Sequence, residues 1–330
     1  MKSPFPNSSS SPGEGRVVVS LRPNKTSALE HITYQYPLKL ISPSLRVDQL
    51  SVLVFLLSYG GGLVGGDTVN LTIEVRAGAK LSIATQGHTK IFPSPSLDVV
   101  TKQKLQVELE HDSALCLLPD PVQPFENSVY EQTQIFNVSL GASLCLLDWV
   151  THGRSARGEN WSLTRWTGRN EVWVPASPTC PKRRLLVRDA VILDGAGRAA
   201  EVGTLPDSMY KNAVMGTLIL RGPLVREVGE FFLAEFAALP RLGARDFRNA
   251  AARQKDEAAS QSPIERWRAA RLAQEKSANL LWSAASVRGC VVVKFGAATV
   301  EAGRTWLGSM LLQEGSIERV FGEQALISVR

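Results

Sequence analysis

The 330-residue sequence lacks the paired cysteines that mark a zinc site or a redox motif. Its cysteines, Cys116, Cys145, Cys180 and Cys290, form no C-x-x-C pair and show no zinc-ligand spacing. Cys116 and Cys145 each begin an apolar Cys-Leu-Leu, which predicts buried free thiols in a reducing compartment. The cysteine pattern therefore argues against a secreted domain that depends on disulfides.

Long hydrophobic runs are absent as well. The longest, around SVLVFLL at 51–57, is far shorter than the ~20 residues that span a bilayer. Residues 1–15 are rich in serine and proline and contain no apolar signal core, which predicts a disordered N-terminal arm. We therefore expect a cytoplasmic protein that does not associate with membranes.

The charge balance shows no strong excess of either sign. The net charge is +6, and much of the basic excess lies in RNAAARQK, IERWRAARL and CPKRR. These segments are predicted to be helix faces or loops, and solvated faces explain most such runs. The sequence therefore predicts no nucleic-acid partner.

The glycine-rich segment GGGLVGGD at 60–67 matches two phosphate-binding spacings, but its surroundings fit neither. The next segment, TVNLTIEV at 68–75, alternates strictly between polar and apolar residues. This alternation predicts a strand where a dinucleotide-binding motif requires a helix. Asp67 and Thr68 also stand where a P-loop has lysine and serine or threonine. A tight corner between two strands, with positive φ angles, explains the glycines better.

A repeated strand pattern occupies the first half of the chain. Three similar segments each begin at a turn pair, continue as an apolar strand and end in polar or proline-rich sequence. They are GAKLSIATQG (78–87), DSALCLLPDP (112–121) and GASLCLLDWV (141–150). Each follows an amphipathic strand. The pattern predicts a mainly β fold of stacked β layers, a β-helix-like scaffold, although a sandwich of hairpins would give the same pattern.

The C-terminal half changes to helical patterns. The sequence from Glu227 to about Gln261 is helical in character, and Ser262-Pro263-Ile264-Glu265 is a capping box with proline at the first helical position. We expect the helix that it starts to end near Ser283. CVVVKFG at 290–296 then returns to a strand.

These patterns indicate one domain over residues 16–330. Strands should predominate over 17–225, and a helical pair should be inserted at about 228–285. The segment TWLGSMLLQ at 305–313 is also expected to be helical.

The loops that leave the second strand of each repeat carry the most reactive side chains. Because the three units share one phase, the loops TQGHTKIF, LPDPVQPFENS and DWVTHGRSARGENW should lie along one edge. They contain His88, Lys90, Asp120, Glu126, Asp148, His152, Arg154, Arg157 and Glu159. Such oxygen and nitrogen donors suit borderline divalent metals, and the same groups can act as general acids and bases. No G-x-S-x-G or H-E-x-x-H motif accompanies them.

Six segments of the sequence resemble the UreD (UreH) family of urease accessory proteins. They are YQYPLKLISP (34–43), GGGLVGGD, TQGHTKIF, LPDPVQPF, DWVTHGRSARGENW and WSAASVRGCVVVKFG (282–296). The resemblance runs in a single order from about residue 16 to the end. Residues 244–262 look like an insertion relative to shorter members, and His88 departs from the small residue usual in the family.

The resemblance implies a non-catalytic, mostly β scaffold with a helical pair. It implies a complex with the helical accessory protein UreF and the GTPase UreG, which together deliver nickel to apo-urease. Any bound nucleotide would then belong to UreG. The resemblance also implies no tightly bound cofactor, only Ni²⁺ in transit.

On this basis we expect Asp67, Asp120, Asp148, His152 and Glu159 to line the nickel route or to bind the metal transiently. Few and imperfect ligands suit transit, because a closed four-ligand site would retain the metal. Arg154 and Arg157 should pair with these carboxylates.

The residues alone leave one alternative open, an acid/base hydrolase using Asp148 and Glu159. Such an enzyme would act alone on a small substrate, whereas a chaperone would be inert without its partners.

Overall fold

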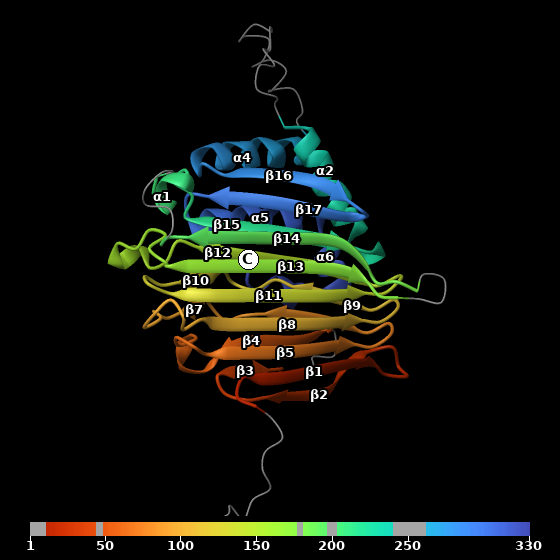
Figure 1. Cartoon of the computed structure of the whole chain (residues 1–330). Helices are drawn as coiled ribbons and strands as arrows, with labels where there is room; N and C mark the ends of the chain where they lie inside the picture. Colours follow the sequence, from red (N-terminus) through yellow and green to blue (C-terminus); the bar gives the residue numbers. More distant parts are fainter. Residues whose placement is uncertain (1–10, 44–48, 177–180, 197–202, 240–261) are drawn as a thin grey trace, which may run out of the picture.

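Two β-sheets packed face to face form the body of the protein (Figure 1). The computed structural model describes residues 11–43, 49–176, 181–196, 203–239 and 262–330. The predicted mainly β fold is confirmed.

The first sheet has seven strands among the described residues, in the order β14-β13-β11-β8-β5-β1-β2. They are β1 (Glu14–Leu21), β2 (Ser27–Tyr34), β5 (Thr68–Val75), β8 (Thr101–Leu109), β11 (Val129–Val138), β13 (Arg165–Val174) and β14 (Arg184–Asp194). Residues on these strands alternate between the interior and solvent. In β8, for example, Leu105 and Val107 are buried, whereas Gln106 and Glu108 are exposed.

The second sheet has ten strands in the described part of the chain, eight of them in the order β16-β17-β15-β12-β9-β6-β4-β3. They are β3 (Leu38–Ile41), β4 (Val52–Ser58), β6 (Lys80–Ala84), β9 (Ala114–Leu117), β12 (Ser143–Thr151), β15 (Val214–Arg221), β16 (Leu281–Val287) and β17 (Cys290–Ala297). The short strand β10 (Val122–Pro124) pairs with β12, and the short strand β7 (Thr89–Ile91) pairs with β10. This sheet is buried on both faces over β9 and β12, which read as nearly continuous apolar runs.

Helices cover the outer face of the second sheet (Figure 1). They are α2 (Arg226–Ala237), α4 (Pro263–Ser277), α5 (Val300–Glu314) and α6 (Ser316–Phe321), with the 3₁₀ turns η3 (Pro223–Val225) and η4 (Glu323–Leu326). The short helix α1 (Leu205–Ser208) instead places Leu205 in the core between the sheets, and the 3₁₀ turns η1 (Tyr59–Gly61) and η2 (Ser155–Arg157) lie in loops. The helix expected around 305–313 is therefore confirmed as part of α5. None of the helices described is both long and apolar enough to cross a bilayer.

The three sequence repeats form successive layers of a stack. Their first strands, β5, β8 and β11, are parallel neighbours in the first sheet. Their second strands, β6, β9 and β12, are parallel neighbours in the second sheet. Because the two strands of one repeat lie in different sheets, the structure confirms β-helix-like stacking and rejects a sandwich of hairpins.

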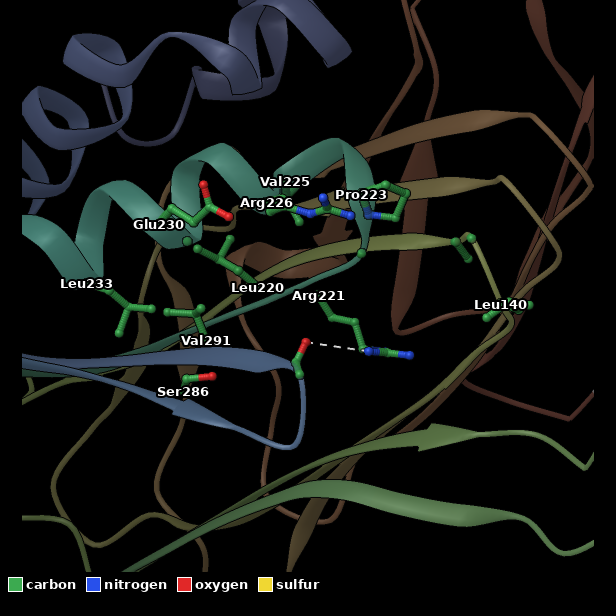
Figure 2. A pocket seen from close by; sticks show the side chains of 15 residues that line it. Leu140, Leu220, Arg221, Pro223, Val225, Arg226, Glu230, Leu233, Ser286 and Val291 are labelled. Carbon is green, nitrogen blue, oxygen red and sulfur yellow. Dashed lines mark hydrogen bonds between the residues drawn. The ribbon is translucent and has the colours of Figure 1, made fainter. Parts of the chain in front are cut away.

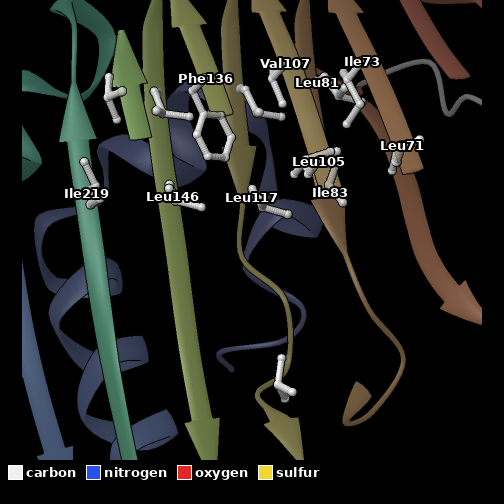
Figure 3. Close-up of a cluster of buried hydrophobic side chains, with 14 of the residues drawn as sticks. Leu71, Ile73, Leu81, Ile83, Leu105, Val107, Leu117, Phe136, Leu146 and Ile219 are labelled. Atoms are coloured by element: carbon white, nitrogen blue, oxygen red, sulfur yellow. The ribbon is translucent and has the colours of Figure 1, made fainter. Parts of the chain in front are cut away.

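The interior between the sheets is filled by aliphatic side chains and a few aromatic rings (Figure 3). Leu71, Leu105 and Phe136 of the first sheet face Ile83 and Leu146 of the second (Figure 3). This apolar contact joins the layers into one core, because each sheet hides its apolar face against the other.

The two cysteines at equivalent repeat positions are buried and unpaired, as predicted. Cys116 and Cys145 are direct partners in the parallel register of β9 and β12. Burial, followed by the neighbouring Cys145 thiol, raises the pKa of Cys116 well above its ordinary value. The thiol of Cys116 is therefore protonated and inert at neutral pH. Cys180 lies outside the described residues.

The glycine-rich segment is a corner between strands, as predicted. Gly60, Gly61 and Gly66 have φ angles of 68°, 77° and 90°, in the left-handed region that glycine tolerates. Strand β5 follows directly, with no helix. A phosphate-binding loop is thus absent here.

Two predicted boundaries are wrong. The N-terminal arm cannot extend to residue 15, because β1 begins at Glu14 and the Gly13 amide donates to the Tyr36 carbonyl at 2.7 Å. Residues 1–10 lie outside the described chain.

The second helix starts at its predicted capping box but ends at Ser277 rather than near Ser283. Asn279 has a left-handed φ of 47°, which breaks the helix. Leu281 and Trp282 then pair with β17 as strand residues, so the helical insertion does not reach residue 285. Residues 240–261 of this predicted helical region lie outside the described chain.

A buried ionic cluster joins the helical pair to the sheet. Arg271 of α4 is 2% exposed and contacts Glu235 of α2 at 3.1 Å and Glu275 at 2.6 Å. Glu275 also accepts hydrogen bonds from the indoles of Trp282 and Trp306, each at 2.9 Å. One carboxylate thereby connects α4, β16 and α5.

Replacing Phe136 by alanine should test the core directly. The ring is fully buried, so Phe136→Ala removes packing that the stacked layers cannot refill, and unfolding free energy should fall by about 3–5 kcal/mol. Chemical denaturation measures this change. Ile192→Ala, at a site 55% exposed, is the control and should change stability by less than about 0.5 kcal/mol. Equal effects from both variants would contradict the assigned core.

Candidate functional site

The three loops that follow the second strand of each repeat lie side by side at one end of the stack. Strand β7 in the first loop pairs with β10 in the second, and β10 pairs with β12, which leads into the third. The Gln123 amide also donates to the Gly153 carbonyl at 3.0 Å. The repeat phase therefore placed these loops correctly, and the question becomes what their polar side chains contact.

Asp120 fastens the second loop to its neighbours. Its carboxylate accepts hydrogen bonds from the Thr85 hydroxyl and the Gly87 amide, both at 2.9 Å. It also pairs with Arg304 of α5 at 2.7 Å. Nearby His88 is half-buried, and this burial lowers the pKa of its imidazole although the Asp120 charge opposes the effect. Asp120 thus has three protein partners.

Glu159 orders the third loop by pairing with Arg154. Its carboxylate accepts from the Arg154 amide at 2.7 Å and Nε at 2.8 Å, and the two charged groups form a close ion pair. The Arg154 guanidinium lies 3.9 Å from the centre of the Phe125 ring. Burial alone would raise the pKa of Glu159, but the Arg154 hydrogen bonds outweigh it and hold the pKa below its ordinary value.

Asp67 and His152 also have local partners. The Asp67 carboxylate accepts the Val64 amide at 2.8 Å and closes the glycine-rich corner. The His152 Nδ1 lies 3.0 Å from the Ala213 carbonyl oxygen, so this ring joins the third loop to the start of β15. Both side chains therefore support backbone turns.

Asp148 differs from the other four because its side chain lies between the two sheets. From β12 it accepts hydrogen bonds from the Gln132 amide of β11 at 2.8 Å and the Asn170 amide of β13 at 2.6 Å. Burial raises the pKa of Asp148, and the charge of Asp189 adds to the effect, while the two amides and Lys294 oppose it. Asp148 is thus a carboxylate whose ionised form is short of compensating charge.

A small cavity lies beside Asp148, next to a larger surface pocket. A cavity of about 10 Å³, large enough for about one water molecule, is lined by Asp148, Asn170 and Asp189. It shares the wall Met215–Thr217 with an outer pocket of about 430 Å³. At their junction the Lys294 ammonium contacts Asp189 at 2.6 Å and the Thr217 hydroxyl at 3.2 Å.

The sequence prediction missed the residues around Asp148, although a signal for some of them was present. On β11, Gln132 lies on the same inward-facing side of the strand as Tyr130 and Phe136. On β13, Asn170 lies on the same inward-facing side as Val172. Polar amides at inward positions indicate a buried hydrogen-bonded group. Asp189 and Lys294 gave no such signal.

The five predicted route residues do not converge on one centre. Within the described ranges, no three His, Cys, Asp or Glu side chains are close enough to hold a metal ion together. The alternative hydrolase gains no support either, because Asp148 and Glu159 are bound by different partners and Glu159 does not line the Asp148 cavity. Among the described residues, four of the five predicted ligands hold loops or corners through protein partners, and Asp148 lies beside a small cavity.

Comparison with known proteins gives the family. The sequence profile of the UreD urease accessory protein family matches residues 11–327. The chain belongs to this family. UreD proteins are accessory proteins of urease, and the match spans both sheets and all the helices described here.

Relatives from distant organisms carry the same description. The chain is 33% identical over 293 residues to an uncharacterized urease accessory protein ureD-like of Schizosaccharomyces pombe. The alignment covers 86% of this chain and 90% of that protein. It is 36% identical over 222 residues to urease accessory protein UreD of Sorangium cellulosum, an alignment that covers 67% of this chain and 65% of that protein. Urease accessory protein D of Oryza sativa subsp. indica is 30% identical over 204 residues, and the alignment covers 61% of this chain and 63% of that protein.

The Glu159–Arg154 pair predicts a pH-dependent contribution to stability. Because the folded pKa of Glu159 lies below its ordinary 4.5, the contribution is complete above pH 4.5 and is lost as the pH falls through the folded value. Glu159→Gln should therefore lower the unfolding free energy by about 1.5 kcal/mol at pH 7, with a difference that shrinks in acid. Thermal unfolding across this pH range measures it. Glu131→Gln, at an exposed site on β11, is the control; a difference independent of pH would contradict the assignment.

Proposed function

We propose that this UreD-family chain is a non-catalytic scaffold that assembles in the cytoplasm with a UreF-type accessory protein, a UreG-type GTPase and apo-urease, and passes Ni²⁺ to urease. Membership in a family of urease accessory proteins supports this role. The chain holds no phosphate-binding loop at its glycine-rich corner, which fits a partner supplying the nucleotide chemistry.

The half-buried carboxylate of Asp148, which lies between the sheets, is the observation that carries the nickel proposal. Its raised pKa reflects a negative charge that burial leaves poorly solvated, so an arriving cation would be stabilised there. The side chain lies next to a cavity that adjoins an open pocket. A single carboxylate with two amide neighbours is also too small a ligand set to retain the metal.

The other predicted route residues take a supporting role in this proposal. Asp67, Asp120, His152 and Glu159 each hold a loop or corner at the same end of the stack. We propose that they shape the surface over which the metal or a partner approaches, and that Asp148 lines the interior part of the route.

Asp148→Asn should lower the nickel content of urease without disrupting the assembly. Asparagine keeps the shape and removes the charge: its oxygen can still accept from one of the two amides, and its NH₂ group can donate to the other once that amide turns its oxygen inward, which gives up the bond this oxygen now accepts from Tyr130 or Gln134. The chain, its partners and urease are co-expressed, and the nickel bound per urease is measured after purification. We expect a several-fold decrease.

Glu131→Gln, an exposed carboxylate on β11 outside the three loops, is the matched control and should leave nickel content unchanged. If Asp148→Asn assembles normally and urease contains full nickel, Asp148 is not on the route. If assembly itself fails, the role of Asp148 is structural.

A further inference from the structure

Two short rows of polar side chains meet between the sheets beside Asp148. In the second sheet, Asp148 of β12 lies opposite Thr217 of β15, and Thr217 lies opposite Lys294 of β17. In the first sheet, Asn170 of β13 lies opposite Asp189 of β14, and its amide donates to Asp148 at 2.6 Å. The Lys294 ammonium donates to Asp189, also at 2.6 Å. The registers of the two sheets therefore build one polar group, which we call the polar rows.

The outer end of the polar rows is a lysine that can move. Lys294 has 49% of its side chain exposed and lines the outer pocket, whereas Asp189 has 12% exposed and lines the small cavity. Thr217, which accepts from Lys294 at 3.2 Å, lines both hollows. The ammonium thus lies where the outer pocket and the Asp148 cavity meet. Its flexible stem can carry it into the pocket, because no packing encloses the exposed half.

The polar rows are one positive charge short. Among the described residues that line the cavity and the outer pocket, the charged side chains are Asp148, Asp189 and Lys294. Two carboxylates and one ammonium leave one negative charge. Burial, and then the charge of Asp189, raises the pKa of Asp148, as expected for a carboxylate that lacks a counter-charge. The rows would therefore be stabilised by more positive charge than Lys294 supplies.

A divalent cation supplies the charge that Lys294 does not. With the ammonium turned into the outer pocket, a divalent ion beside Asp148 and Asp189 makes the group neutral. A monovalent ion would leave the same single negative charge that the ammonium leaves now, so it gains nothing by the exchange. Carboxylate and hydroxyl oxygens are ligands for divalent ions, which fits the groups that line the cavity.

We propose that Lys294 controls the entry of a divalent cation to the cavity beside Asp148: its ammonium holds the cation position at Asp189 and Thr217 and is displaced into the outer pocket when the metal arrives. This inference rests on the nickel route proposed above and adds the residue that selects what enters it. Exchange of one cation for another never leaves Asp189 without a partner, which avoids the cost of an unpaired buried charge.

Equilibrium dialysis of the full chain against NiCl₂ at fixed ionic strength tests the assignment. Lys294→Met keeps the stem and removes the ammonium, so Ni²⁺ should bind at least about fivefold more tightly. Lys294→Arg keeps the charge and should bind as the wild type does. Combining Lys294→Met with Asp148→Asn should abolish the gain. Lys104→Met, at an exposed lysine on the outer face of β8, is the matched control and should leave the affinity unchanged.

The outcomes separate this inference from the proposed function. If Lys294→Met keeps the wild-type unfolding midpoint and binds Ni²⁺ no more tightly, the inference is overturned. A gain that survives Asp148→Asn also overturns it, because the metal then binds outside the cavity. If the gain depends on Asp148 while Asp148→Asn leaves the nickel content of co-expressed urease unchanged, control of entry stands and the delivery route fails. Lys294→Gln, which can still donate to Asp189, should show the same gain and replaces the methionine variant if that variant unfolds.

Discussion

The in-register parallel pairing of successive repeats is the constraint on which the rest of the structure depends. Leu81, Leu115 and Leu144 lie side by side across β6, β9 and β12, and Leu71 and Leu105 do the same across β5 and β8. Because side chains alternate with a period of two, a slip of one residue in any layer would turn its apolar row to the solvent. The shared core thus fixes the register, and the register fixes which end of the stack receives each loop.

The same register creates a polar group inside an apolar core. Gln132 and Asn170 occupy inward positions on neighbouring strands, and Asp148 reaches them from the opposite sheet. Three polar side chains that satisfy one another are tolerable, whereas any one alone would cost stability. A sheet interface that needed only stability would be filled by apolar residues at these positions. The presence of this polar group next to a cavity therefore favours a functional role for it.

Local patterns in the sequence predicted the elements and the stacking but not the contacts between distant segments. The glycine corner, the capping box at Ser262 and the three-loop edge all follow from residues close together in the chain. The partners of the loop carboxylates do not. Arg304, 184 residues from Asp120, neutralises it, and Lys294 meets Asp189 across 105 residues. The positions of acidic residues in the sequence could therefore identify candidate ligands, but could not show that most of these side chains are already bound by other protein groups.

Strand β12 runs between two hollows of the molecule. The turn before it, at Leu140–Ala142, lines a groove of about 640 Å³ beside the start of α2 (Figure 2), and Asp148 lies near its other end. β12 is hydrogen-bonded to β9 on one side and to β15 on the other, and its residues are largely buried, so it is held rigidly. A partner bound at the groove would therefore be placed at a fixed position relative to Asp148. This suits a scaffold that orients other proteins, because its contribution is geometry rather than a catalytic group of its own.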